Sequence, residues 1–128
     1  LDELNRRLLA QGKPPVDMRR FRANVVLSGT EAHDEDRVVQ MQIATVTSGN
    51  AHNKVVLKLV KPCPRCPIPN IDPDTANTNT AVGDTLQGYR KDPRLDGAIT
   101  FGMNAIALQG EGEVLRVGQR VTGDWVFA

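Results

Sequence analysis

The stretch Lys61-Pro62-Cys63-Pro64-Arg65-Cys66 contains both cysteines of a 128-residue chain, so any thiol chemistry of this protein takes place here. Two thiols separated by two residues suit three kinds of chemistry: shared binding of one metal ion, a small reversible disulfide, or one activated thiolate. The spacing alone does not choose between them. Prolines at positions 62, 64, 67 and 69 stiffen the segment and prevent a helix from starting directly after the pair.

The surrounding sequence gives these alternatives unequal support. A structural zinc site needs four ligands, and the other candidates, His33 and His52, match no zinc-finger spacing. A thioredoxin-type pair opens a helix after a strand, which the prolines oppose. Two unreactive thiols in a rigid loop are the simplest alternative. We favour a rigid loop that displays one thiolate beside Arg65 and Lys61, because their positive charge favours ionised sulfur as a nucleophile or metal ligand.

Length and composition predict one globular domain or one part of a larger one. A chain of 128 residues and 14.0 kDa is long enough for an ordinary core without disulfides or zinc. Its 16 basic and 15 acidic residues leave a net charge of +1, which provides no general attraction for nucleic acid. No apolar run approaches the ~18 residues of a membrane span, and no signal peptide is recognisable. We therefore expect a cytoplasmic, reducing setting, with neither nucleic acid nor membrane as a partner.

Short segments of alternating hydrophobicity predict an all-β fold with one or two short helices. Leucines at helical spacing predict a helix over residues 1–12, followed by a linker over residues 13–17 with two prolines. Alternation over residues 39–43 and 55–59 predicts a hairpin whose second strand delivers the cysteine loop. Short strands are also expected at residues 25–27 and 105–108, and Asp84 is expected to cap a short helix over residues 85–90. Several short strands separated by glycine turns are typical of a β-barrel.

Seven short segments occur in a fixed order between residues 18 and 121. They are Phe21-Arg22-Ala23-Asn24 with the following Ser28-Gly29, Glu35-Asp36-Arg37, Lys61-Pro62-Cys63-Pro64-Arg65-Cys66, Asp72-Pro73-Asp74-Thr75, Leu86-x-x-Tyr89-Arg90, Phe101-Gly102-Met103-Asn104 and Leu115-x-Val117-Gly118. In this order they resemble the MOSC domain, the molybdenum-cofactor sulfurase C-terminal module, in the branch of the amidoxime-reducing components. Several positions differ from the family pattern: Ala23 stands where proline is usual, Ala76 where glycine is usual, Val38 where an aromatic residue is usual, Pro69 and Asn70 where threonines are usual, and Met103 where glutamine is usual.

The resemblance implies a MOSC-type β-barrel that binds the pyranopterin molybdenum cofactor, molybdopterin. It places the thiolate ligand of molybdenum on Cys66, and it assigns Arg65, Arg22 and Asn24 to the pterin and its phosphate. Cys63 has no ligand role in that arrangement. The chemistry of these residue types agrees, because thiolates are soft ligands that suit such metals and the planar fork of arginine suits a phosphate in two-point contact.

The resemblance also implies a role in an oxidoreductase that reduces N-hydroxylated compounds. Electrons would come from a partner, either an electron-donor reductase or an iron–sulfur or haem protein, because two cysteines cannot hold a four-cysteine cluster. The N-terminal barrel half of the family is missing here, and the chain opens at Leu1 in a helical pattern. We therefore expect residues 1–128 to be a MOSC domain from the C-terminal part of a longer polypeptide.

Two other functions stay open at this point. In the first, the protein is a sulfur carrier or sulfurtransferase, and Cys66 forms a persulfide as a nucleophile rather than as a metal ligand. In the second, the protein is a non-catalytic β-barrel binding module whose cysteines are inert.

Overall fold

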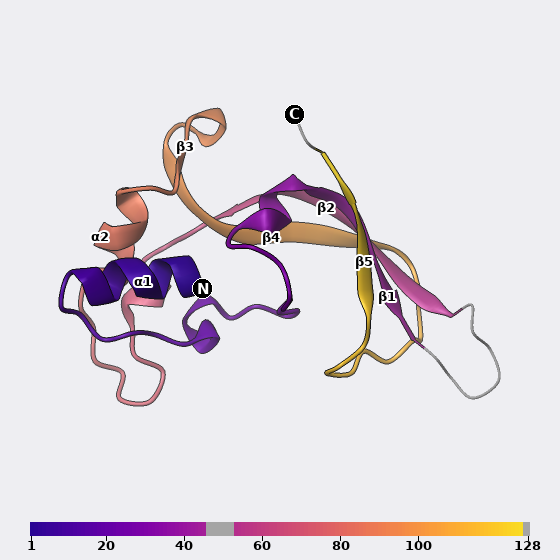
Figure 1. Ribbon diagram of the computed structural model, residues 1–128, viewed down its shortest axis with the longest axis horizontal. Helices are drawn as coiled ribbons and strands as arrows, with labels where there is room; N and C mark the ends of the chain where they lie inside the picture. The colour runs from indigo at the N-terminus through magenta and orange to yellow at the C-terminus, as the bar shows by residue number, and fades with distance from the viewer. Residues whose placement is uncertain (46–52, 127–128) are drawn as a thin grey trace. The chain divides into compact units, whose positions relative to one another are not determined.

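The computed structural model describes residues 1–45 and 53–126, and its contacts divide the chain into two compact units. The first unit comprises Leu1–His33 and Cys63–Phe101, and the second comprises Asp34–Pro62 and Gly102–Ala128. Figure 1 shows the elements of both. Every residue that the sequence singled out for cofactor or metal binding lies in the first unit.

The first unit contains both α-helices of the described chain. Helix α1 (Asp2–Ala10) has acidic residues in its first turn and Arg7 in its last turn, which suits the helix dipole. Helix α2 spans Ala81–Gln87. Three short 3₁₀ helices accompany them: η1 (Met18–Phe21), η3 (Ile68–Asn70) and η4 (Pro93–Leu95). Strand β3 (Lys91–Asp92) pairs antiparallel with the start of β4 (Ala98–Gln109).

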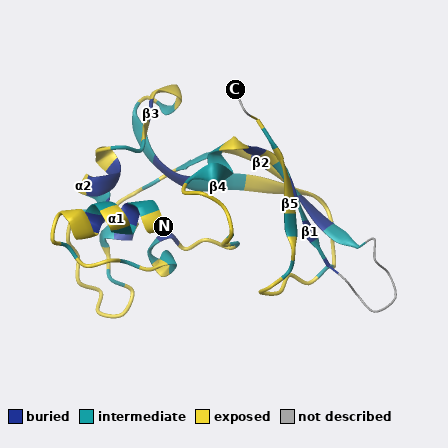
Figure 2. Ribbon diagram, viewed as in Figure 1, coloured by how far each residue is buried: buried dark blue, intermediate teal, exposed yellow. Residues whose placement is uncertain are grey.

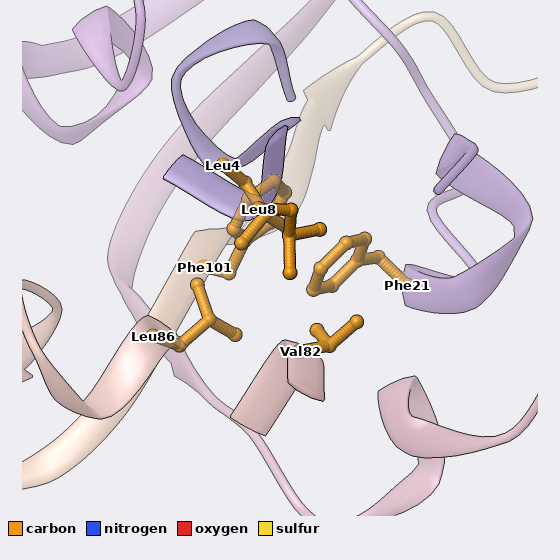
Figure 3. Close-up of a cluster of buried hydrophobic side chains, with 6 residues drawn as sticks. All are labelled: Leu4, Leu8, Phe21, Val82, Leu86 and Phe101. Carbon is orange, nitrogen blue, oxygen red and sulfur yellow. The ribbon is translucent and has the colours of Figure 1, made fainter. Parts of the chain in front are cut away.

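One cluster of apolar side chains forms the core of this unit. Its members are completely or almost completely buried and come from both helices, η1 and β4: Leu4, Leu8, Phe21, Val82, Leu86 and Phe101. Figure 3 shows these side chains pointing toward one another. The rings of Phe21 and Phe101 stack with their centroids 3.8 Å apart and their planes inclined by 9°. This stack joins η1 to β4.

The second unit is built on antiparallel pairing around β1 (Val38–Ala44), which follows the 3₁₀ helix η2 (Asp34–Arg37). Strand β1 pairs with β2 (Lys54–Pro64) in the register Met41 to Leu57 and with β5 (Val121–Trp125) in the register Met41 to Gly123. The strand order is β3-β4-β2-β1-β5. The predicted pairing of these two strands is therefore confirmed, and residues 46–52 between them lie outside the described residues.

The structure is mostly sheet with two short helices, and the sheet of the described strands is open, with β3 and β5 at its ends. Closure into a barrel therefore stays a prediction. Among the described residues, no helix combines the length and the apolar character needed to cross a bilayer. Figure 2 shows the buried positions of α1, α2 and the first half of β4, and the exposed second half of β4.

Two local predictions were wrong. Residues 25–27 form no strand, and Val26 is 59% exposed, because this segment has no pairing partner among the described strands. Asp84 does not precede its helix, which begins one turn earlier at Ala81. The hydroxyl of Thr80 donates to the Asp84 carboxylate over 2.8 Å, so Asp84 stabilises the first turn from within.

Two neighbouring leucines of α1 test the assignment of the core. Leu8 is fully buried, whereas Leu9 is 59% exposed. We expect Leu8→Ala to lower the free energy of unfolding by about 2–5 kcal/mol through lost contacts and a cavity, and Leu9→Ala to change it by less than about 0.5 kcal/mol. Denaturant unfolding of both variants measures this difference. Equal losses would contradict the orientation of α1.

Candidate functional site

The cysteine segment leaves the end of β2 as a nearly extended chain. Cys63 belongs to β2, and the backbone N–H of Arg65 donates to the carbonyl of Ile99 on β4 over 2.8 Å. Pro62 and Pro64 have no N–H group, so this stretch offers few donors for further strand pairing. Because the proline ring also restricts φ, Pro62 and Pro64 limit the conformations of the backbone that leads to Arg65 and Cys66.

The two cysteines are not placed as a disulfide pair. Both are free; Cys63 is half-buried with its thiol 3.7 Å from the carbonyl oxygen of Pro64, and Cys66 is exposed. In an extended chain, residues three positions apart point to opposite faces and lie roughly 10 Å apart. A disulfide requires α-carbons within about 7 Å. This geometry disfavours a thioredoxin-type pair and leaves Cys66 as the accessible thiol.

The guanidinium of Arg65 points back into the unit. Its Nε and Nη2 atoms donate to the carbonyl oxygen of Phe101 over 2.9 and 2.7 Å, and its Nη1 donates to the carbonyl oxygen of Phe21 over 2.9 Å. The group also lies over the Phe21 ring, 5.3 Å from its centroid. Three of its five N–H groups are thus used by the main chain, and two remain for a ligand.

The residue after Phe21 has an unusual backbone. Arg22 has a φ of 53° in the left-handed region, where a residue other than glycine costs about 1–2 kcal/mol. Its N–H donates to the carbonyl of Arg19 over 3.2 Å, and the preceding carbonyl receives the Arg65 hydrogen bond. A hydrogen bond from a charged donor contributes about 1.5–3 kcal/mol, enough to offset the strained backbone.

Arg22 and Asn24 lie on the surface just beyond this corner. Both are exposed, and within the described residues neither side chain has a hydrogen-bond or ion-pair partner. The structure therefore connects Cys66 with Arg65 along the chain and Arg65 with Arg22 through the carbonyl of Phe21. It shows no contact that ties the side chain of Asn24 to the other three among those residues.

Two arginines that precede Arg22 in the sequence, Arg19 and Arg20, have a structural role. Arg19 forms ion pairs with Asp17 and Asp74, and the mostly buried Arg20 donates to the carbonyl of Pro69 over 3.2 Å. The hydrogen bonds from Arg19 hold the pKa of the Asp74 carboxyl below its usual value. This ion pair is therefore present above the usual carboxyl range and is lost as the pH falls through the lowered pKa. The sequence did not predict this tether, for which the opposite charges of Arg19 and Asp74 are the only available signal.

His33, to which the sequence assigned no role, takes part in packing. Its Nε2 lies 3.1 Å from the Tyr89 hydroxyl, and its ring meets the Phe101 ring edge-on at 5.4 Å between centroids. Burial raises the pKa of Tyr89. His33 thus packs against the Phe101 ring of the Phe21–Phe101 stack. The spacing of residues in the sequence did not predict this contact.

The exposed groups suit one kind of ligand. Cys66 offers a thiol, Arg22 a guanidinium without a partner among the described residues, and Asn24 an amide. A thiolate binds thiophilic metals, and a free guanidinium binds phosphate or carboxylate groups. By residue type these groups can therefore bind a metal ion and an anion. Over the described stretches 1–45 and 53–126, no three His, Cys, Asp or Glu residues gather as a metal site.

Comparisons with known proteins agree with the sequence pattern. A model of the MOSC domain family matches residues 1–122. Over 91 residues the chain is 36% identical to mitochondrial amidoxime reducing component 2 of Rattus norvegicus, 34% to that of Homo sapiens and 33% to that of Macaca fascicularis. Each match covers 70% of this chain and 23% of the relative. The matched region therefore spans less than a quarter of these relatives.

The loop after the cysteine segment contains a strained alanine whose replacement is informative. Ala76 has a φ of 61° and its N–H donates to the carbonyl of Asp72 over 2.9 Å. We expect Ala76→Gly to raise the free energy of unfolding by about 0.5–1 kcal/mol, because relief of strain exceeds the entropy cost of glycine. Ala10→Gly, in the last turn of α1, is the control and should lower it by up to about 1 kcal/mol. A loss for both variants in denaturant unfolding would contradict the left-handed loop.

Proposed function

Because the chain belongs to the MOSC domain family, we propose that it binds the pyranopterin molybdenum cofactor, molybdopterin, as a domain of a molybdenum-dependent oxidoreductase. The relatives are named amidoxime reducing components, which supports N-hydroxylated compounds as the substrates of the whole enzyme. The observation that carries the proposal is the exposed thiol of Cys66 directly after Arg65, whose guanidinium also holds the Arg22 corner.

We assign the residues to roles by their surroundings. Cys66 provides the thiolate ligand of molybdenum, because it is the accessible thiol. Arg22 binds the phosphate with a guanidinium that has no other partner among the described residues, and Asn24 hydrogen-bonds the pterin. Arg65 contributes at most the two N–H groups that the main chain leaves unused. When bound, the molybdenum supplies the redox chemistry, and these residues bind and orient it.

Such a domain needs partners. We propose an electron-donor reductase, or an iron–sulfur or haem protein, as the source of electrons. We further propose an N-terminal barrel half of the same polypeptide as a partner of this domain. The cytoplasmic setting stays a prediction from the cysteine content, and the names of the relatives refer those proteins to mitochondria.

Metal analysis of the full-length natural protein tests the proposal, with protein purified from a host that makes molybdenum cofactor. We expect about one molybdenum per chain in the wild type and in Cys63→Ser, since Cys63 is half-buried and has no ligand role. Cys66→Ser should lose at least about tenfold, because a hydroxyl is a much poorer ligand for molybdenum than a thiolate. Molybdenum absent from the wild type, or retained in Cys66→Ser, would contradict the proposed ligand.

The exposure of Cys66 also favours one alternative, sulfur transfer through a persulfide on this thiol. In that case the wild type, incubated with thiosulfate, whose outer sulfur is transferred to the thiolate as sulfite leaves, should carry about one cyanide-labile sulfur per chain. Cys66→Ser should carry none, and Cys63→Ser should match the wild type. If the protein carries neither molybdenum nor labile sulfur, the remaining hypothesis is a non-catalytic binding module.

A further inference from the structure

One peptide unit, between Phe21 and Arg22, is held at both of its polar ends. Its carbonyl oxygen accepts from Nη1 of Arg65 at 2.9 Å, and its N–H donates to the carbonyl of Arg19 at 3.2 Å. A peptide unit is planar, so fixing both ends fixes its orientation. This peptide plane directly precedes the left-handed backbone of Arg22. Its orientation, together with that φ angle, therefore sets the direction of the Arg22 side chain.

The same guanidinium is held on its other side by strand β4. Nε and Nη2 share the carbonyl oxygen of Phe101, and the backbone N–H of Arg65 donates to the carbonyl of Ile99. The side chain of Arg65 therefore links three stretches of chain: the Phe21–Arg22 corner, β4 and the cysteine segment. Cys66 is the next residue after Arg65, so the link ends at the accessible thiol.

This arrangement differs from that of an arginine that serves a ligand directly. A guanidinium that binds phosphate presents its parallel N–H groups outward, whereas Arg65 spends three of five on main-chain carbonyls and is only half exposed. Arg22 has the opposite character, because it is exposed and without a partner among the described residues.

We propose that Arg65 is a positioning residue, which acts through the carbonyls of Phe21 and Phe101 to hold the Arg22 corner in register with the Cys66 thiol. This proposal rests on the proposed function, because the relative placement of Arg22 and Cys66 matters only if both residues bind the cofactor. Lysine at this position would keep the charge, but its ammonium lacks the planar fork that joins two carbonyls. The Arg22 corner should then open although the charge is preserved.

Arg90 offers a matched control. Its Nε donates to the carbonyl of Thr100 over 2.8 Å, so it anchors a main-chain oxygen of β4 one residue before Phe101. Its hydrogen bonds to Thr100 are separate from the bonds of Arg65 to Phe21 and Phe101. Arg90→Lys thus removes a similar anchor from the same strand without releasing the Arg22 corner.

The experiment compares wild type, Arg65→Lys and Arg90→Lys in the full-length protein, with and without cofactor. Amide hydrogen exchange, resolved by residue, measures opening of residues 20–24 against the rest of the first unit, and metal analysis measures retained molybdenum after dialysis. We expect Arg65→Lys to speed exchange at the Arg22 amide at least tenfold in the cofactor-free protein and to lower retained molybdenum. Arg90→Lys should leave exchange at Arg22 and retained molybdenum unchanged.

Each other result overturns the proposal in a recognisable way. Loss of molybdenum with unchanged exchange at Arg22 would make Arg65 a direct ligand only. Acceleration of all amides of the unit together would make it a general stabiliser. Wild-type protein without molybdenum would refute the proposed function, whereas the exchange measurement on cofactor-free protein would still decide whether Arg65 holds the corner.

Discussion

The stack of Phe21 on Phe101 is the contact on which the first unit depends (Figure 3). Their side chains occupy the centre of the apolar core, and their carbonyl oxygens are the two acceptors of the Arg65 guanidinium. The same two residues therefore support the core through their rings and the site through their main chain. Burial of the rings excludes water from one side of these hydrogen bonds, which strengthens them. Loss of the stack would therefore disturb the hydrogen bonds through which Arg65 holds the Arg22 corner.

Much of the fold could be predicted from periodicity. The alternation around Met41 and Leu57 predicted the β1–β2 hairpin, and the spacing of Leu4 and Leu8 predicted α1. Both predictions work because an element buried on one face has apolar residues at the period of that element. The same reasoning failed at Val26, because three apolar residues in a row do not show whether a partner strand exists. It also failed at the start of α2, where several residues in succession could cap a helix.

The candidate site could be predicted in its composition but not in its geometry. The motifs predicted Arg65, Cys66 and Arg22 as site residues. The inward direction of the Arg65 guanidinium could not be predicted, because its acceptors are main-chain carbonyls, which every residue has. The ion pair of Arg19 with Asp74 could not be predicted either, because the two residues are far apart in the sequence. Closure of the sheet into a barrel, expected from the short strands and from the family resemblance, remains a prediction.

The chain separation of the Arg65 contacts has a consequence for folding. The guanidinium meets a carbonyl 44 residues earlier and another 36 residues later, so each contact closes a long loop. Loop closure costs entropy before the contact repays it, and contacts of this kind form late in folding. The β1–β2 hairpin, which lies between Phe21 and Arg65 in the sequence, closes a much shorter loop and should form first. A newly made chain would therefore form this hairpin before Arg22 is held in place.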